Sequence, residues 1–223
     1  MILLNKRLIK YDTMNTPRGR KKTSSSGSAK KELLIAEAER IFADKGFHAT
    51  SIRDIACATD SNVAMIYYYF RNKEDLYLQI LDDTFRKMSE CIQESIEAAG
   101  DEEERIRLVI RTYIAFMGTR KHIPRIMARE MAEGGEHFAI IMQRYLSRNY
   151  AAVHDTIKSG IDRGLFSPVD PSLSPLCMIG MMVFFFVASP TIKRILNRQD
   201  YDIQFLEQIT AQVTHIFFNG IKK

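Results

Sequence analysis

The chain has 223 residues, of which 46% are hydrophobic and 26% are charged, and its formal net charge at pH 7 is +5. This composition can supply one or two hydrophobic cores of ordinary size, and the low numbers of proline (6) and glycine (11) favour long helices. The three cysteines are odd in number and widely separated, which argues against a disulfide framework and for a reducing cytoplasm.

Positive charge is concentrated in the first third of the chain. Residues 1–73 contain 14 Lys and Arg against 7 Asp and Glu, whereas residues 74–223 contain 18 against 20. A basic segment followed by a nearly neutral one suits a polyanion-binding domain joined to a domain with a different task.

The first 28 residues are expected to form a disordered arm. Their opening apolar run is interrupted by charge and is followed by no small-residue cleavage site, so we expect no secretory signal. Residues 18–28 are basic and then serine-rich, with too little apolar surface to fold. The arm either adds contacts to DNA phosphates or the minor groove, or is a solvated tail, and Met14 is a rival start.

A helix-turn-helix is predicted after a first helix over residues 29–45. The stretch 50–73 fits two short helices, the first beginning at Thr50 or Ser51. Asp54 follows three residues after Ser51, where a capping box usually has Glu or Gln, so the box is expected to be incomplete. Four small polar residues then form the turn, and Ser61 or Asn62 can cap the second helix.

The second short helix suits insertion into the major groove of DNA, since its outer face begins with small side chains and carries tyrosines. Lys73 opens the following helix, where its charge and the helix dipole favour a phosphate. The alternative is an ordinary helical hairpin with surface tyrosines. The candidate DNA-binding residues are Thr50, Ser51, Arg53, Asn62, Val63, Ala64, Met65, Tyr67, Tyr68 and Lys73.

The sequence T-S-I-R-D-I-A at 50–56, with I-Y-Y-Y-F-R-N-K-E-D-L at 66–76, resembles the helix-turn-helix of the TetR family of bacterial transcriptional regulators. The likeness covers about residues 30–80. It departs in the turn, where Asp60 stands in place of the family's usual glycine, although aspartate tolerates the left-handed conformation. The resemblance implies an all-α fold with a DNA-binding domain at residues 29–73, and an effector-binding and dimerisation domain at residues 74–223.

Further helices are expected along the rest of the chain. Residues 73–98 contain no proline or glycine, and a helix of that length, about 39 Å, can join the two domains, so that a tilt at one end moves the other. Acidic residues 101–104 mark a helix start. The helices after it are expected over residues 106–117, 122–132 and 136–163.

The stretch 176–188 is apolar on every side but falls short of the length needed to cross a bilayer, so no membrane partner is expected. One of its faces can pack inside the subunit and the other against a second copy. Apolar positions from Phe205 to Phe217 offer another stripe in the last helix. A homodimer through these last two helices would place two reading heads on successive major grooves of a palindrome.

The resemblance also implies an effector pocket in the second domain, and methionine with flat aromatic residues suits an adaptable apolar one. The same residues at helical spacing could instead be plain core. Arg129 and Glu130 could add polar selectivity or form an interhelical ion pair. The candidate ligand-binding residues are Tyr113, Phe116, Met117, Met127, Arg129, Glu130, Phe138, Met142 and Tyr145.

No catalytic residue, metal site or cofactor is predicted. Nucleophile-elbow and phosphate-loop motifs are missing from the sequence, and glycines interrupt the one metal-like spacing, Glu133 and His137. We expect a bacterial, cytoplasmic repressor, nucleoid-associated when bound to DNA, that a small apolar effector releases from a palindromic operator. The alternatives are a helical carrier or enzyme with a vestigial reading head, and a sequence-indifferent DNA-binding protein.

Overall fold

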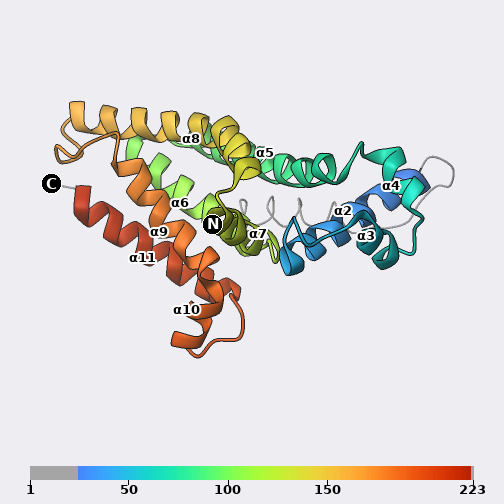
Figure 1. Ribbon diagram of the computed structural model, residues 1–223. Coiled ribbons are helices and arrows are strands. Elements are labelled where there is room, and N and C mark those ends of the chain that lie inside the picture. Colours follow the sequence, from blue (N-terminus) through green and yellow to red (C-terminus); the bar gives the residue numbers. More distant parts are fainter. Residues whose placement is uncertain (1–24, 222–223) are drawn as a thin grey trace. The chain divides into compact units, whose positions relative to one another are not determined.

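The computed structural model describes residues 25–221, and within that range the chain forms helices α2 to α11 and no strand (Figure 1). The predicted all-α fold is confirmed. The chain divides into two compact units, the first ending at Ile80 and the second beginning at Leu81. The division falls within helix α5 (Lys73–Ala98), whose bounds agree with the predicted helix over residues 73–98.

The first unit contains α2 (Ser25–Lys45), α3 (Ile52–Ala58), α4 (Val63–Tyr69) and the beginning of α5. Its centre is apolar because α2, α4 and α5 each turn one stripe inward. Phe42, Ile66 and Phe70 are almost fully buried, and the Phe42 ring meets the Tyr77 ring edge-on at 4.9 Å. The inward orientation predicted for Ile66 and Phe70 is confirmed.

The start of α2 differs from the expectation that the first 28 residues are disordered. The helix begins at Ser25, and the Ser28 hydroxyl donates a hydrogen bond of 3.0 Å to the Glu32 carboxylate one turn later. That side-chain pairing supports a first turn that lacks apolar residues. The rest of the expected arm, residues 1–24, lies outside the described residues.

Local hydrogen bonds set the ends of the two short helices. Ser51 and Asp54 form a complete capping box, so the shorter aspartate closes a motif that was expected to be incomplete. Asn62 caps α4, its side-chain oxygen accepting a 2.7 Å hydrogen bond from the Met65 amide. Between the helices Asp60 adopts a φ of 46°, the left-handed conformation expected where a glycine is usual.

The second unit comprises the remainder of α5 followed by six helices. They are α6 (Glu102–Gly118), α7 (Ile123–Glu133), α8 (Glu136–Asp162), α9 (Ser174–Val187), α10 (Ser189–Ile195) and α11 (Ile203–Ile221). Helix α6 packs against α8, α9 and α11 and is the centre of this unit (Figure 1). Gly118 allows the close approach of α11, because a Cβ there would overlap the Leu206 side chain.

Backbone breaks separate the helices of the second unit. Gly134 and Gly135 both have positive φ and interrupt the chain between α7 and α8, as expected. The apolar stretch predicted as one helix over residues 176–188 is α9, and α10 follows after a bend of 75° at Ala188 and with Pro190 in its first turn. In the described part of the chain, no single helix is long and apolar enough to cross a membrane; only the bent pair α9 and α10 has the length and composition.

Candidate DNA-reading face and effector cavity

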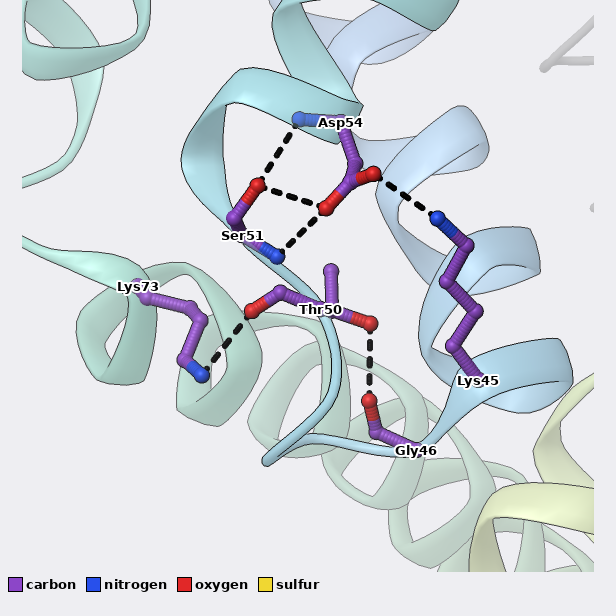
Figure 2. Close-up of polar contacts among 6 residues, drawn as sticks. All are labelled: Lys45, Gly46, Thr50, Ser51, Asp54 and Lys73. Atoms are coloured by element: carbon purple, nitrogen blue, oxygen red, sulfur yellow. Dashed lines mark hydrogen bonds and ion pairs between the residues drawn. The ribbon is translucent and has the colours of Figure 1, made fainter.

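The capping box of α3 belongs to a larger network at the end of α2. Asp54 accepts a hydrogen bond from the Ser51 backbone N–H at 2.8 Å and pairs with the Lys45 ammonium at 2.8 Å (Figure 2). Hydrogen bonds from Lys45 and Ser51 hold the pKa of the Asp54 carboxyl well below its usual range. Asp54 therefore stays ionised and joins α3 to α2.

Thr50 and Lys73 lie on the inner side of the same network. The Thr50 hydroxyl donates to the Gly46 carbonyl at 2.7 Å, and the Thr50 side chain is buried. The Lys73 ammonium donates to the carbonyls of Phe47 and Thr50 at 2.8 and 2.9 Å, and it lies 4.3 Å from the centre of the Phe47 ring (Figure 2 shows the Thr50 bond). Two of the three ammonium donors are thus used within the first unit. The role predicted for Lys73 on a phosphate stays a prediction.

The outer surface of α3 and α4 presents most of the other candidate DNA-binding residues. Tyr68 is 81% exposed and Tyr67 is 54% exposed. Both values are high for tyrosine, whose large ring is usually mostly buried. Val63 and Met65 are half-buried. The remaining candidates, which are exposed to solvent, are Ser51, Arg53, Asn62 and Ala64. Their contacts with DNA stay predictions.

A cavity of about 310 Å³ lies in the second unit between α5, α6, α7, α8 and α9. Apolar side chains make up almost all of its wall, with methionine from four helices and aromatic rings from three. Five of the residues predicted to bind a ligand line it, namely Tyr113, Met127, Phe138, Met142 and Tyr145.

Four other candidates do not line the cavity. Phe116 and Met117 are buried elsewhere in the unit, and the Phe116 ring lies 4.7 Å from the Arg120 guanidinium. The buried Glu130 carboxylate accepts a 3.2 Å hydrogen bond from the Phe138 amide at the start of α8. Arg129 is also absent from the wall. Glu130 thus serves the α7–α8 junction, where a first-turn amide needs an acceptor.

Two helices of this wall, α5 and α9, carry none of the residues predicted to bind a ligand, and α8 contributes more residues than the three predicted from it. One face of α9 lines the cavity through Met178 and Met182, which are buried, whereas the sequence predicted only that one face of this helix packs inside the subunit and the other against a second copy. The apolar spacing along α5 and α8 was visible in the sequence, but spacing does not identify the opposing helix. The principal residues missed are Phe85, Met88, Ile92, Leu146, Asn149, Tyr150, Val153, Met178, Ile179 and Met182.

Helices α9 and α11 also leave large apolar side chains in solvent. Leu176 and Phe184 of α9 are 48% and 61% exposed, and Ile203 and Ile216 of α11 are 68% and 51% exposed. The two helices pack against each other within the unit. Exposed apolar groups on neighbouring helices are typical of a protein interface.

Two family models match this chain, one in each of its two units. The model for bacterial regulatory proteins of the tetR family matches residues 34–80. A second model, for the C-terminal domain of the HTH-type transcriptional dual regulator CecR, matches residues 102–221. Among curated proteins, the HTH-type transcriptional regulator EthR of Mycolicibacterium smegmatis is 24% identical over 210 residues, which cover 92% of each chain.

Solved structures with this fold include the ketosteroid transcriptional regulator KstR2 of Mycobacterium tuberculosis. Its TM-score is 0.72 at 19% identity, and the match covers 92% of this chain and 100% of that one. AibR in complex with isovaleryl coenzyme A and operator DNA has a TM-score of 0.67 at 20% identity, with 84% and 97% coverage. These likenesses establish the shared fold, and the matched relatives are regulators of transcription rather than enzymes.

Proposed function

Because this chain belongs to the TetR family of bacterial transcriptional regulators, we propose that it is a repressor that leaves a palindromic operator when a small apolar effector binds. The observation that carries the proposal is the combination of a tyrosine-rich exposed α4 in the first unit with an apolar cavity in the second. Such a protein works in the bacterial cytoplasm and lies on the nucleoid while it is bound to DNA.

The reading face is proposed to be α4 with the start of α3. Ala64 at the beginning of α4 leaves room for base edges, while the exposed Tyr67 and Tyr68 can donate to phosphate oxygens. Arg53 adds a positive charge on α3. The capping box of Ser51 and the cap by Asn62 hold both helix starts in place, so a DNA contact costs little ordering of the backbone.

A homodimer is proposed to form through α9 and α11. Phe184 and Ile216 are each more than half exposed in the single chain, and a second copy would remove them from water. A two-fold symmetric pair presents two copies of α4, which is how helix-turn-helix proteins read the two halves of a palindrome.

The effector is proposed to occupy the cavity between α5 and α9. The volume of about 310 Å³ lies at the lower end of the range of about 300–1,000 Å³ found for ligand pockets. The similar protein AibR was solved with isovaleryl coenzyme A, a molecule with a short apolar acyl group. An apolar group of that kind suits the wall of methionine and aromatic side chains.

Helix α5 is proposed to carry the signal. Leu76 and Tyr77 of α5 are buried in the first unit, while Phe85, Met88 and Ile92 of the same helix line the cavity. An effector that binds more tightly to one orientation of α5 shifts the population of dimers with the correct spacing of reading helices. Release from DNA then follows from that difference in affinity.

The experiment that tests this function is selection of bound duplexes from a random pool by the purified full-length protein near physiological salt. Tyr67→Ala and Tyr68→Ala are selected in parallel, with Lys158→Ala, an exposed lysine on α8, as the control. We expect a palindrome that the control binds like the wild type and that both tyrosine variants bind about 3- to 10-fold more weakly. Failure to enrich any sequence would refute the repressor function and favour a carrier or a non-specific DNA-binding protein.

A further inference from the structure

Four residues of the cavity wall carry a polar side-chain group. The hydroxyls of Tyr145 and Tyr150 already donate to Asp82 and to the Ser172 carbonyl, whereas the polar groups of Tyr113 and Asn149 are available to a ligand. Tyr113 of α6 and Asn149 of α8 both line the cavity, and their side chains belong to residues that are only 2% and 7% exposed. A polar group that faces an apolar cavity is costly to leave unpaired, so a ligand atom that can pair with either side chain is favoured there.

Asn149 is oriented by α5. Its side-chain oxygen accepts hydrogen bonds from the Ser89 hydroxyl and from the Gln93 amide, both at 3.0 Å. These two donors occupy the carbonyl end of the amide and leave its NH2 group as the available end. Within residues 25–221 that NH2 group has no hydrogen-bond acceptor, although Asn149 belongs to the cavity wall.

The Tyr113 hydroxyl also lacks a hydrogen-bond partner among the described residues. The Tyr113 ring packs edge-on against the Phe186 ring at 6.3 Å. Burial raises the pKa of Tyr113, so the hydroxyl keeps its proton and remains a donor at physiological pH. The neighbouring wall residue Tyr150 differs, because its hydroxyl donates to the Ser172 carbonyl at 3.0 Å.

The absence of charged residues among the described wall residues limits the net charge of the ligand group that can enter. Among the described residues that form the wall there is no lysine, arginine, histidine, aspartate or glutamate. An ionised group brought into this cavity would lose its hydration without gaining a counter-charge, which is strongly unfavourable. Whatever part of the ligand enters must therefore be neutral.

We infer that the cavity selects a neutral carbonyl group, a ketone or a thioester, within an apolar ligand, and that the Asn149 amide and the Tyr113 hydroxyl donate hydrogen bonds to its oxygen atom. This inference rests on the proposed effector function and names its ligand chemistry. Recognition of the carbonyl by Asn149 would also act directly on α5, since the same amide holds Ser89 and Gln93.

The test compares ligands that differ only in the carbonyl. Decanoyl coenzyme A is paired with decyl coenzyme A, the thioether that lacks the oxygen, and 2-decanone is paired with 1-decene. Affinities are measured by calorimetry with the full chain for wild type, Tyr113→Phe and Asn149→Leu. Tyr201→Phe is the matched control, because it removes a partly buried hydroxyl that lies outside the cavity wall and donates to the Phe185 carbonyl at 2.8 Å.

We expect the wild type to prefer the carbonyl member of at least one pair by about 3- to 10-fold, and the pair that shows the preference distinguishes a thioester from a free ketone. Tyr113→Phe and Asn149→Leu should each reduce that preference and leave the affinity for the compound without the carbonyl unchanged. Tyr201→Phe should keep the preference of the wild type. Thermal denaturation of the free variants identifies any variant that fails to fold, and Tyr113→Phe, which removes one oxygen atom, decides the question if Asn149→Leu does not fold.

Equal affinity of the wild type for both members of both pairs would overturn the inference, as would binding of none of the four compounds. Selection of duplexes is an independent measurement. If a palindrome is recovered and the carbonyl preference is missing, only the ligand chemistry is wrong; if neither is found, the repressor function fails as well.

Discussion

The Arg163 guanidinium meets the Glu102 carboxylate at 2.6 Å and joins the end of α8 to the start of α6. The Glu102 side chain is buried, and it also accepts a hydrogen bond of 2.8 Å from the Ser159 hydroxyl. The helix that forms the centre of the second unit is therefore held at its first turn by a charge from a helix more than fifty residues away.

Stability of the second unit should fall in acid because of this pair. Hydrogen bonds from Arg163 and Ser159 lower the pKa of Glu102 from 4.5 to about 2. The group binds fewer protons in the folded state, so its stabilisation is present above pH 4.5 and is lost as the pH falls toward 2. Urea denaturation between pH 7 and pH 2 should show this loss in the wild type and little of it in Glu102→Gln.

Arg163→Ala provides the complementary measurement at pH 7. We expect the free energy of unfolding to decrease by about 1–2 kcal/mol, because the Arg163 side chain is 61% exposed and water screens part of the attraction. The pair of Arg86 and Glu90, whose side chains are 41% and 50% exposed, is the control, and Arg86→Ala should cost less. Equal effects of the two substitutions would contradict a special role for Glu102.

Lys73→Met should destabilise the first unit. The substitution keeps a chain of similar length and removes the two hydrogen bonds to the carbonyls of Phe47 and Thr50, which we expect to cost about 1–3 kcal/mol. Thermal denaturation measures the loss. The salt dependence of operator binding addresses the phosphate contact predicted from sequence, since a true contact would lower the slope by about 1 in Lys73→Met.

Val109→Phe should uncouple DNA binding from the effector. Val109 lines the cavity and is buried, so a larger side chain there occupies the space that the ligand needs. Gel-shift titrations should show normal operator affinity and no release by an effector that releases the wild type. Arg111→Ala, an exposed position on the same helix, should respond like the wild type. Normal release by the Val109 variant would place the effector outside this cavity.

Phe184→Glu and Ile216→Glu should convert the proposed dimer to a monomer. Each substitution would bury a charge in the interface, which costs several kcal/mol without a partner. Sedimentation measures the mass, and the full palindrome should lose affinity more than its half-site. Ile195→Glu, at a position of α10 that is 74% exposed, is the control and should leave the dimer intact. A dimer that persists in both variants would rule out α9 and α11 as the interface.

The sequence by itself determined the features that depend on near neighbours. Ser51 and Asn62 were identified as possible helix caps, and the backbone reversal at Asp60 was expected, because each involves residues a few positions apart. The bounds of α5 followed from 26 residues without proline or glycine. Motif spacing was also enough to recognise the family that the comparisons confirm.

Only the tertiary structure decided which distant side chains meet. The carbonyl partners of Lys73 lie 26 and 23 positions earlier, and Ser89 meets Asn149 across 60 positions. Helical periodicity shows that a face is apolar, but it does not identify the helix on which that face packs. The wall of the cavity is therefore known only from the packing of five helices. Phe116 and Met117 were wrongly predicted to line it, because the apolar pattern shows that they are buried but not where. The hydrophobic effect depends on the apolar area removed from water and not on where a side chain points. A binding site, by contrast, needs side chains that point into the same cavity.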